Sequence, residues 1–177
     1  MKIIDDFLSP SYADEIESIL DSPNQEWYFN KNISKTEESK TVNYGFSYWI
    51  LRPDGNFTAS KISFLLQPFL CQVKDTIQKQ TVCRCRLDMT VSSGTEVLHD
   101  PHVDMPGINN TTVIYYANKT DGDTVVYNET QPSDEYTIQY LIPPKKNRLV
   151  IFDGNQYHTG HSPLTYQNRI LINSNFI

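Results

Sequence analysis

Apolar residues recur at helical spacing in two segments of the first eighty residues. The first predicted helix begins at Pro10, is capped by Ser9, and carries an apolar stripe made of Tyr12, Ile16, Ile19 and Leu20. The second carries a longer stripe, with Pro68 on its polar side as an expected kink: Ile62, Leu65, Leu66, Phe69, Leu70, Val73 and Ile77. We expect this second stripe to pack against a sheet.

From residue 82 onward the pattern changes to a period of two, which is typical of strands. The clearest run alternates the apolar Cys83, Leu87, Met89 and Val91 with the polar Arg84, Arg86, Asp88 and Thr90. Further strands are predicted over residues 1–8, 111–117, 124–127, 135–142, 148–152 and 169–176, and turn residues separate the later ones. Helices followed by many strands favour an antiparallel sandwich or barrel with the helices on one outer face.

The composition is that of a globular protein with a β-rich fold. The 177 residues include 38% apolar residues, eleven Tyr and eight Phe, so a single domain over residues 1–177 is expected, with 1–80 as mixed support and 81–177 as the core. The net charge of −6 argues against a nucleic-acid partner, because binding to phosphates needs clustered Lys and Arg. The sequence predicts neither a membrane span nor a signal peptide, and we therefore expect a cytoplasmic protein.

The three cysteines are expected to be reduced thiols. Their number is odd, and Cys83-Arg84-Cys85 lacks the spacing and the partner pair of a zinc site. We therefore do not expect the cysteines to bind a metal.

All four histidines of the chain fall in two short clusters: His99 with His102, and His158 with His161. In an extended segment, His102 and Asp104 project to the same face because side chains alternate along a strand. A further histidine from the second cluster would complete a site of two imidazoles and one carboxylate. This ligand set leaves positions open on the metal and is typical of non-heme Fe(II) oxygenases.

These residues resemble the 2-oxoglutarate/Fe(II)-dependent oxygenases, in particular the prolyl-4-hydroxylase-like branch. The family motif is His-x-Asp, a distal His some fifty residues later, and an Arg or Lys about ten residues after that. The sequence has His102-Val103-Asp104, His158 and Arg169 in this order. The flanking segments 113–118, 122–124 and 147–153, and the opening segment 3–9, are also similar to the family.

The resemblance implies a double-stranded β-helix (jelly roll) with supporting N-terminal helices. It implies that His102, Asp104 and His158 bind Fe(II), and that 2-oxoglutarate chelates this iron through its keto acid end. Arg169 would bind the far carboxylate with two parallel hydrogen bonds, assisted by Tyr116, and Asn173 would line the same pocket. The implied reaction uses O₂, releases succinate and CO₂, and hydroxylates a C–H bond.

Two alternatives and one departure from the family remain at this point. His161 competes with His158 as the distal ligand, and the spacing to residues 152 and 169 favours His158. His99 competes with His102, but His99 lacks the carboxylate two residues later that His102 has. The family often has a Tyr on the strand before the first motif, and here only Thr90 or Ser92 could take its place.

The resemblance suggests peptidyl-proline as the substrate class, within a broader expectation of a protein, peptide or small-molecule substrate. A nucleobase substrate fits the acidic charge less well. A hypothesis from another class is a non-catalytic β-sandwich that holds a metal such as structural zinc, closed by His99 or His161 as fourth ligand. The polar segment over residues 30–41 is predicted to be a loop that influences substrate choice.

Overall fold

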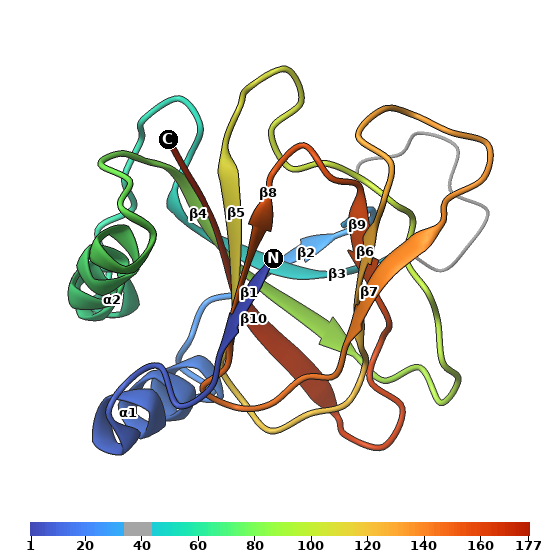
Figure 1. Ribbon diagram of the computed structural model, residues 1–177. Helices are drawn as coiled ribbons and strands as arrows, with labels where there is room; N and C mark the ends of the chain where they lie inside the picture. The colour runs from blue at the N-terminus through green and yellow to red at the C-terminus, as the bar shows by residue number, and fades with distance from the viewer. Residues whose placement is uncertain (34–43) are drawn as a thin grey trace.

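Two antiparallel sheets face each other, and two helices cover the outer face of the larger sheet (Figure 1). The computed structural model describes residues 1–33 and 44–177. The elements within these residues, in chain order, are β1 Lys2–Ile4, α1 Pro10–Leu20, β2 Tyr28–Asn30, β3 Gly45–Leu51, α2 Lys61–Ile77, β4 Val82–Val91, β5 Thr111–Tyr116, β6 Thr124–Tyr127, β7 Ile138–Ile142, β8 Leu149–Asp153, β9 His158–Gly160 and β10 Asn168–Phe176.

The strand order confirms the predicted double-stranded β-helix. The larger sheet has the order β1-β8-β5-β10-β4-β3-β2, and the smaller sheet has the order β7-β6-β9. Isolated bridges pair Leu98 with His161 and His102 with His158, and they extend the smaller sheet along β9. The first eighty residues contribute β1, β2 and β3 to the larger sheet as well as both helices.

The helices form where the apolar stripes predicted them. Pro10 begins α1, and the Ser60 side chain caps α2 by accepting a hydrogen bond of 3.3 Å from the backbone N–H of Ser63. The buried faces of both helices pack against the outward-facing residues of the larger sheet. The helices contribute Ile16, Leu20, Leu66, Phe69 and Val73, and the sheet contributes Cys85, Leu87, Ile170 and Ile172. This layer is the main hydrophobic core.

The inner face of the larger sheet is divided between apolar and polar side chains. A second apolar cluster lies between the two sheets: Ile114, Tyr116, Val126, Ile142, Val150, Phe152 and Leu171. Beside it, the polar positions of β4 and β10 also point inward, including Arg84, Arg86, Thr90, Arg169 and Asn173, which are all buried. The space between the sheets therefore carries the polar groups of the site.

Several expected boundaries are wrong. β4 ends at Val91, so His102 and Asp104 lie in the connection between β4 and β5, where His102 forms an isolated bridge with His158. β1 and β7 are shorter than predicted, and β9 was not predicted at all. Most of the loop predicted over residues 30–41 lies outside the described residues. No helix among residues 1–33 and 44–177 is long and apolar enough to cross a membrane.

Candidate metal and cosubstrate site

A short backbone ladder brings the two histidine clusters together. The N–H of His102 donates to the carbonyl of His158 at 3.0 Å, and the N–H of His158 donates to the carbonyl of His102 at 2.9 Å. Residues that exchange both hydrogen bonds in an antiparallel pair stand directly opposite each other, with their side chains on one face. As a result, the two imidazole rings lie 4.8 Å apart, centroid to centroid.

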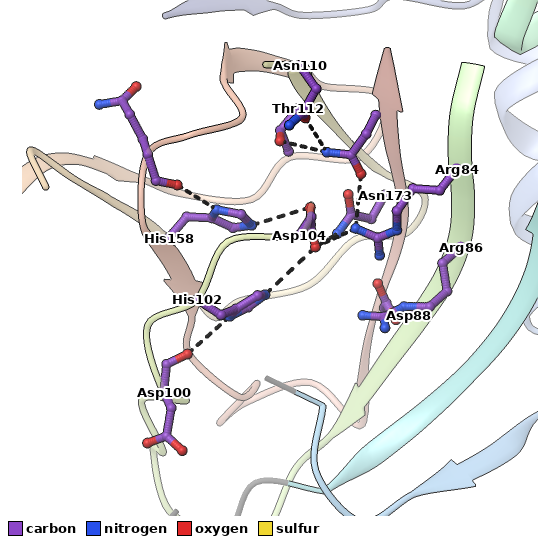
Figure 2. A network of polar contacts seen from close by, with 12 residues as sticks. Arg84, Arg86, Asp88, Asp100, His102, Asp104, Asn110, Thr112, His158 and Asn173 are labelled. Atoms are coloured by element: carbon purple, nitrogen blue, oxygen red, sulfur yellow. Dashed lines mark hydrogen bonds and ion pairs between the residues drawn. The ribbon is translucent and has the colours of Figure 1, made fainter. Parts of the chain in front are cut away.

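Each imidazole is oriented by a backbone carbonyl. The Nδ1 atom of His102 lies 3.1 Å from the Asp100 carbonyl (Figure 2). The Nδ1 atom of His158 lies 3.1 Å from the Gln156 carbonyl. A carbonyl can only accept, so both rings carry the proton on Nδ1 and leave the Nε2 lone pair free. Burial and the neighbouring His158 lower the pKa of His102 to about 3, so its ring is neutral, as a metal ligand requires.

Asp104 supplies the third group and lies deep in the barrel, with its side chain 3% exposed. Its Oδ1 atom lies 2.5 Å from Nη1 of Arg84 and accepts a hydrogen bond of 3.3 Å from Asn173. Burial alone would raise the pKa of Asp104, but the adjacent Arg84 guanidinium holds this pKa well below its usual value. Asp104 is therefore an anion in the folded protein.

The donor atoms of these three residues fit a metal ion. One ligand atom from each of His102, Asp104 and His158 lies within 4.8 Å of the others. The buried Oδ2 of Asp104 and Nε2 of His158 lie 3.6 Å apart, and neither has a hydrogen-bond partner among the described residues. Such groups are costly to bury alone, whereas a cation bound between them would satisfy both. Two imidazoles and one carboxylate are a suitable set for Fe(II).

Arg169 lies in the same pocket as the two imidazoles and is 4% exposed. Its Nη2 donates to the Thr124 hydroxyl at 2.7 Å, and its guanidinium lies over the Tyr116 ring at 5.6 Å. No carboxylate among the described residues forms an ion pair with it, and burial lowers its pKa. A buried arginine that faces a pocket without an acidic partner is suited to bind the carboxylate of a ligand.

Both imidazoles of the metal group line this pocket, and Arg169 lines it too, so one pocket joins the metal group to Arg169. Tyr116 lies behind Arg169, where its hydroxyl is 2.6 Å from that of Thr124. Asn173 lines the pocket too, but it contacts the metal group through Asp104 and not Arg169. The structure thus brings all six predicted site residues to one region, with Asn173 nearer to the metal group than to the cosubstrate group.

The competing residues have other positions. Neither His99 nor His161 belongs to the cluster of possible metal ligands found among the described residues. His99 lines the pocket near Arg169, and burial lowers its pKa to about 4. Thr90, directly opposite Arg169 in the sheet, also lines the pocket, whereas Ser92 is bonded to neighbouring loop residues.

Sequence reasoning missed several residues of this site. Arg84, Arg86 and Asp88 all belong to the polar half of the alternation in β4, which was the available signal. Thr124 opens a predicted strand, but nothing in its surroundings indicates that its hydroxyl joins Tyr116 to Arg169.

The comparisons with known proteins agree with this geometry. The sequence matches the 2OG-Fe(II) oxygenase superfamily over residues 89–177, half of the chain. The protein belongs to this superfamily, whose members use Fe(II), 2-oxoglutarate and O₂, and it is accordingly a dioxygenase. A search of curated protein sequences gives no significant match.

Solved structures of the superfamily share the fold across nearly the whole chain. A prolyl hydroxylase from Trichoplax adhaerens, solved with a hypoxia-inducible-factor peptide, superposes with a TM-score of 0.69 at 16% identity, covering 99% of this chain and 82% of that one. A prolyl-4-hydroxylase from Pseudomonas putida gives 0.65 at 11% identity, covering 99% and 90%. The α-ketoglutarate-dependent epimerase SnoN of nogalamycin biosynthesis gives 0.66 at 10% identity, covering 99% and 76%. Relatives this distant show the fold and leave the substrate open.

Proposed function

We propose that His102, Asp104 and His158 bind Fe(II), that Arg169 and Thr124 bind the far carboxylate of 2-oxoglutarate, and that the protein hydroxylates a C–H bond of a substrate held in the same pocket. The observation that carries this proposal is the pair of unsatisfied buried ligand atoms, Asp104 Oδ2 and His158 Nε2, in a pocket shared with a buried arginine that lacks an acidic partner.

The roles of the side chains follow from their chemistry. Bound iron would allow O₂ to act as the oxidant for C–H hydroxylation, with 2-oxoglutarate as the co-reductant that is converted to succinate and CO₂. The carbonyls of Asp100 and Gln156 keep the Nε2 lone pairs of both histidines available. Arg84 holds Oδ1 of Asp104 and leaves Oδ2 for the metal. Tyr116 and Thr124 fix the plane of the Arg169 guanidinium, which orients its paired donors.

The proposal is tested by anaerobic titration of the protein with Fe(II) and 2-oxoglutarate. Chelation of a keto acid to Fe(II) produces a visible charge-transfer absorption, which needs no knowledge of the substrate. We expect the wild type to show this band and His158→Ala to lose it. Arg169→Met should still bind Fe(II) but require at least about tenfold more 2-oxoglutarate, because a charge-assisted hydrogen-bonded pair is lost.

His161→Ala is the matched control, since His161 lies three residues from His158 and outside the ligand cluster. It should keep the band. Loss of the band in His161→Ala with retention in His158→Ala would contradict the assigned ligand set. Absence of both iron binding and the band in the wild type would refute the proposed function itself.

The structural neighbours include enzymes of different kinds, so they offer more than one class of substrate to test. Prolyl hydroxylases occur among these neighbours, and one was solved with a peptide. We therefore propose peptides that contain proline as the first substrates to test, with succinate formation from 2-oxoglutarate as the readout. Small acids form the second group to test.

A further inference from the structure

A second arginine faces the pocket beside the proposed metal site. Arg86 leaves β4 on the same side as Arg84 and points toward the metal group (Figure 2). It lines the pocket together with His102 and is 6% exposed. The metal and cosubstrate roles described above make no use of its charge.

Two neighbouring side chains hold the guanidinium of Arg86: Asp88 on the edge that carries Nε, and Trp49 on one face. Its Nε lies 2.6 Å from Oδ1 of Asp88, the neighbour two residues along the strand. The ring of Trp49, which stands opposite Arg86 on β3, lies 5.4 Å from the guanidinium carbon. Among the described residues, Asp88 is the only carboxylate within ion-pair distance of this group. The two Nη groups are thus held in place, and their N–H groups donate no hydrogen bond to any described residue.

The side-chain charges that face the interior sum to one positive charge, which a bound anion could neutralise. Among the described residues, Arg84, Arg86 and Arg169 face Asp88 and Asp104 in the pocket and the small cavity that adjoins it. Fe(II) and the 2-oxoglutarate dianion would cancel each other, so one positive charge would remain uncompensated. Buried charge of this kind is costly unless a partner neutralises it.

We propose that Arg86 is a substrate-binding residue and that the primary substrate presents a carboxylate to its two Nη groups beside the metal site. This inference rests on the proposed function, because it places the substrate next to the iron. A planar carboxylate matches the spacing of the arginine fork and forms two parallel charge-assisted hydrogen bonds. Trp49 and Asp88 preorganise the fork, which reduces the entropy lost on binding.

The test uses Mn(II), which is paramagnetic and does not support turnover, with saturating 2-oxoglutarate to occupy Arg169. Binding of Mn(II) is measured first from the loss of its free EPR signal. Proton relaxation of three small probes is then measured. They are N-acetylglycine, its uncharged amide, and N-acetylaspartic acid α-amide, which keeps only its side-chain carboxylate. We expect Mn(II) to enhance relaxation of the acids and not of N-acetylglycinamide. In Arg86→Gln, binding of the acids should weaken about tenfold or more.

Arg52→Gln is the matched control, because Arg52 also stacks on Trp49, at 5.4 Å, but is exposed and does not line the pocket. It should behave as the wild type. A larger effect on N-acetylglycine assigns the carboxylate to a free acid, and a larger effect on the aspartic acid derivative assigns it to an acidic peptide. Equal relaxation of the acids and the uncharged amide, or acid binding unaffected by Arg86→Gln, would overturn the inference while leaving Mn(II) binding intact. Failure of Mn(II) to bind would instead overturn the metal site on which it rests.

Discussion

Replacing Arg84 with Met should strongly destabilise the metal-free protein. The substitution removes the cation from a buried pair whose two side chains are each 3% exposed and whose atoms lie 2.5 Å apart. Breaking such a pair leaves an uncompensated buried charge, which costs about 3–5 kcal/mol. Asn175 also loses the hydrogen bond of 2.9 Å that Arg84 donates to its side-chain oxygen, at a cost of about 1 kcal/mol. For a domain of this size, the expected fall in Tm is about 10 °C or more.

The measurement is thermal and chemical denaturation followed by circular dichroism, with a chelator present throughout. Asp104→Asn should also destabilise, because it leaves Arg84 unpaired, whereas the double variant should recover about 2–3 kcal/mol relative to the sum of the single losses. The pKa of Asp104 in the folded state lies well below its usual 3.8. The ion pair therefore stabilises the fold above about pH 4, and the difference between wild type and Arg84→Met should shrink as the pH falls.

Arg148→Met provides the comparison for an exposed pair. Arg148 donates to both oxygens of Asp5, at 2.7 and 3.1 Å, but the Asp5 side chain is 38% exposed. Surface pairs contribute about 0–1 kcal/mol, so this variant should melt within a few degrees of the wild type. If Arg84→Met melts as close to the wild type as Arg148→Met does, or if the double variant is simply additive, the buried pair does not have the energetic role inferred here.

Three further predictions concern separate parts of the molecule. In Gly160→Ala, the new Cβ would lie 3.1 Å from both Nη atoms of Arg169, so the concentration of 2-oxoglutarate needed for half-saturation should rise about tenfold with Fe(II) affinity unchanged, as measured by absorption titration. Burial raises the pKa of Cys85 to about 12, so iodoacetamide should label the exposed Cys71 and spare Cys85 in the native protein; equal labelling by mass spectrometry would contradict this. Leu87→Ala removes a fully buried side chain from the main core and should cost about 2–5 kcal/mol in denaturant unfolding; a loss below about 1 kcal/mol would contradict this packing.

Local periodicity was sufficient to predict the helices and most strands. Each of α1 and α2 buries one face, and a helix with one buried face shows apolar residues at helical spacing whichever element it packs against. The prediction was weakest for β9, which has only three residues and is held by pairing to β6 and to the segment around His102. A strand of this length carries too few positions to show alternation, and its partners are distant in sequence.

The six site residues were chosen from spacing and from resemblance, and the structure places all of them in one region. The detailed role of Asn173 could not be predicted, because it depends on which side chain stands across the barrel from β10. Spacing along the chain places Asn173 two positions beyond Leu171 on the face of Arg169. Only the closure of the barrel places Asp104 within hydrogen-bond distance of it.

The same limit explains why Arg84 and Arg86 were missed. The alternation in β4 indicates only that these arginines point away from the helical side of the sheet, and on most antiparallel sheets that side faces water. Here the smaller sheet covers that face, so a polar half that resembles a solvated surface becomes the lining of a pocket. Burying arginines without function is costly, so their presence indicates partners. Arg84 has Asp104 as its partner, and Arg169 has the cosubstrate under the proposed function. Arg86 has Asp88 on one edge only, so its other edge is the position at which the substrate's own charge is to be sought.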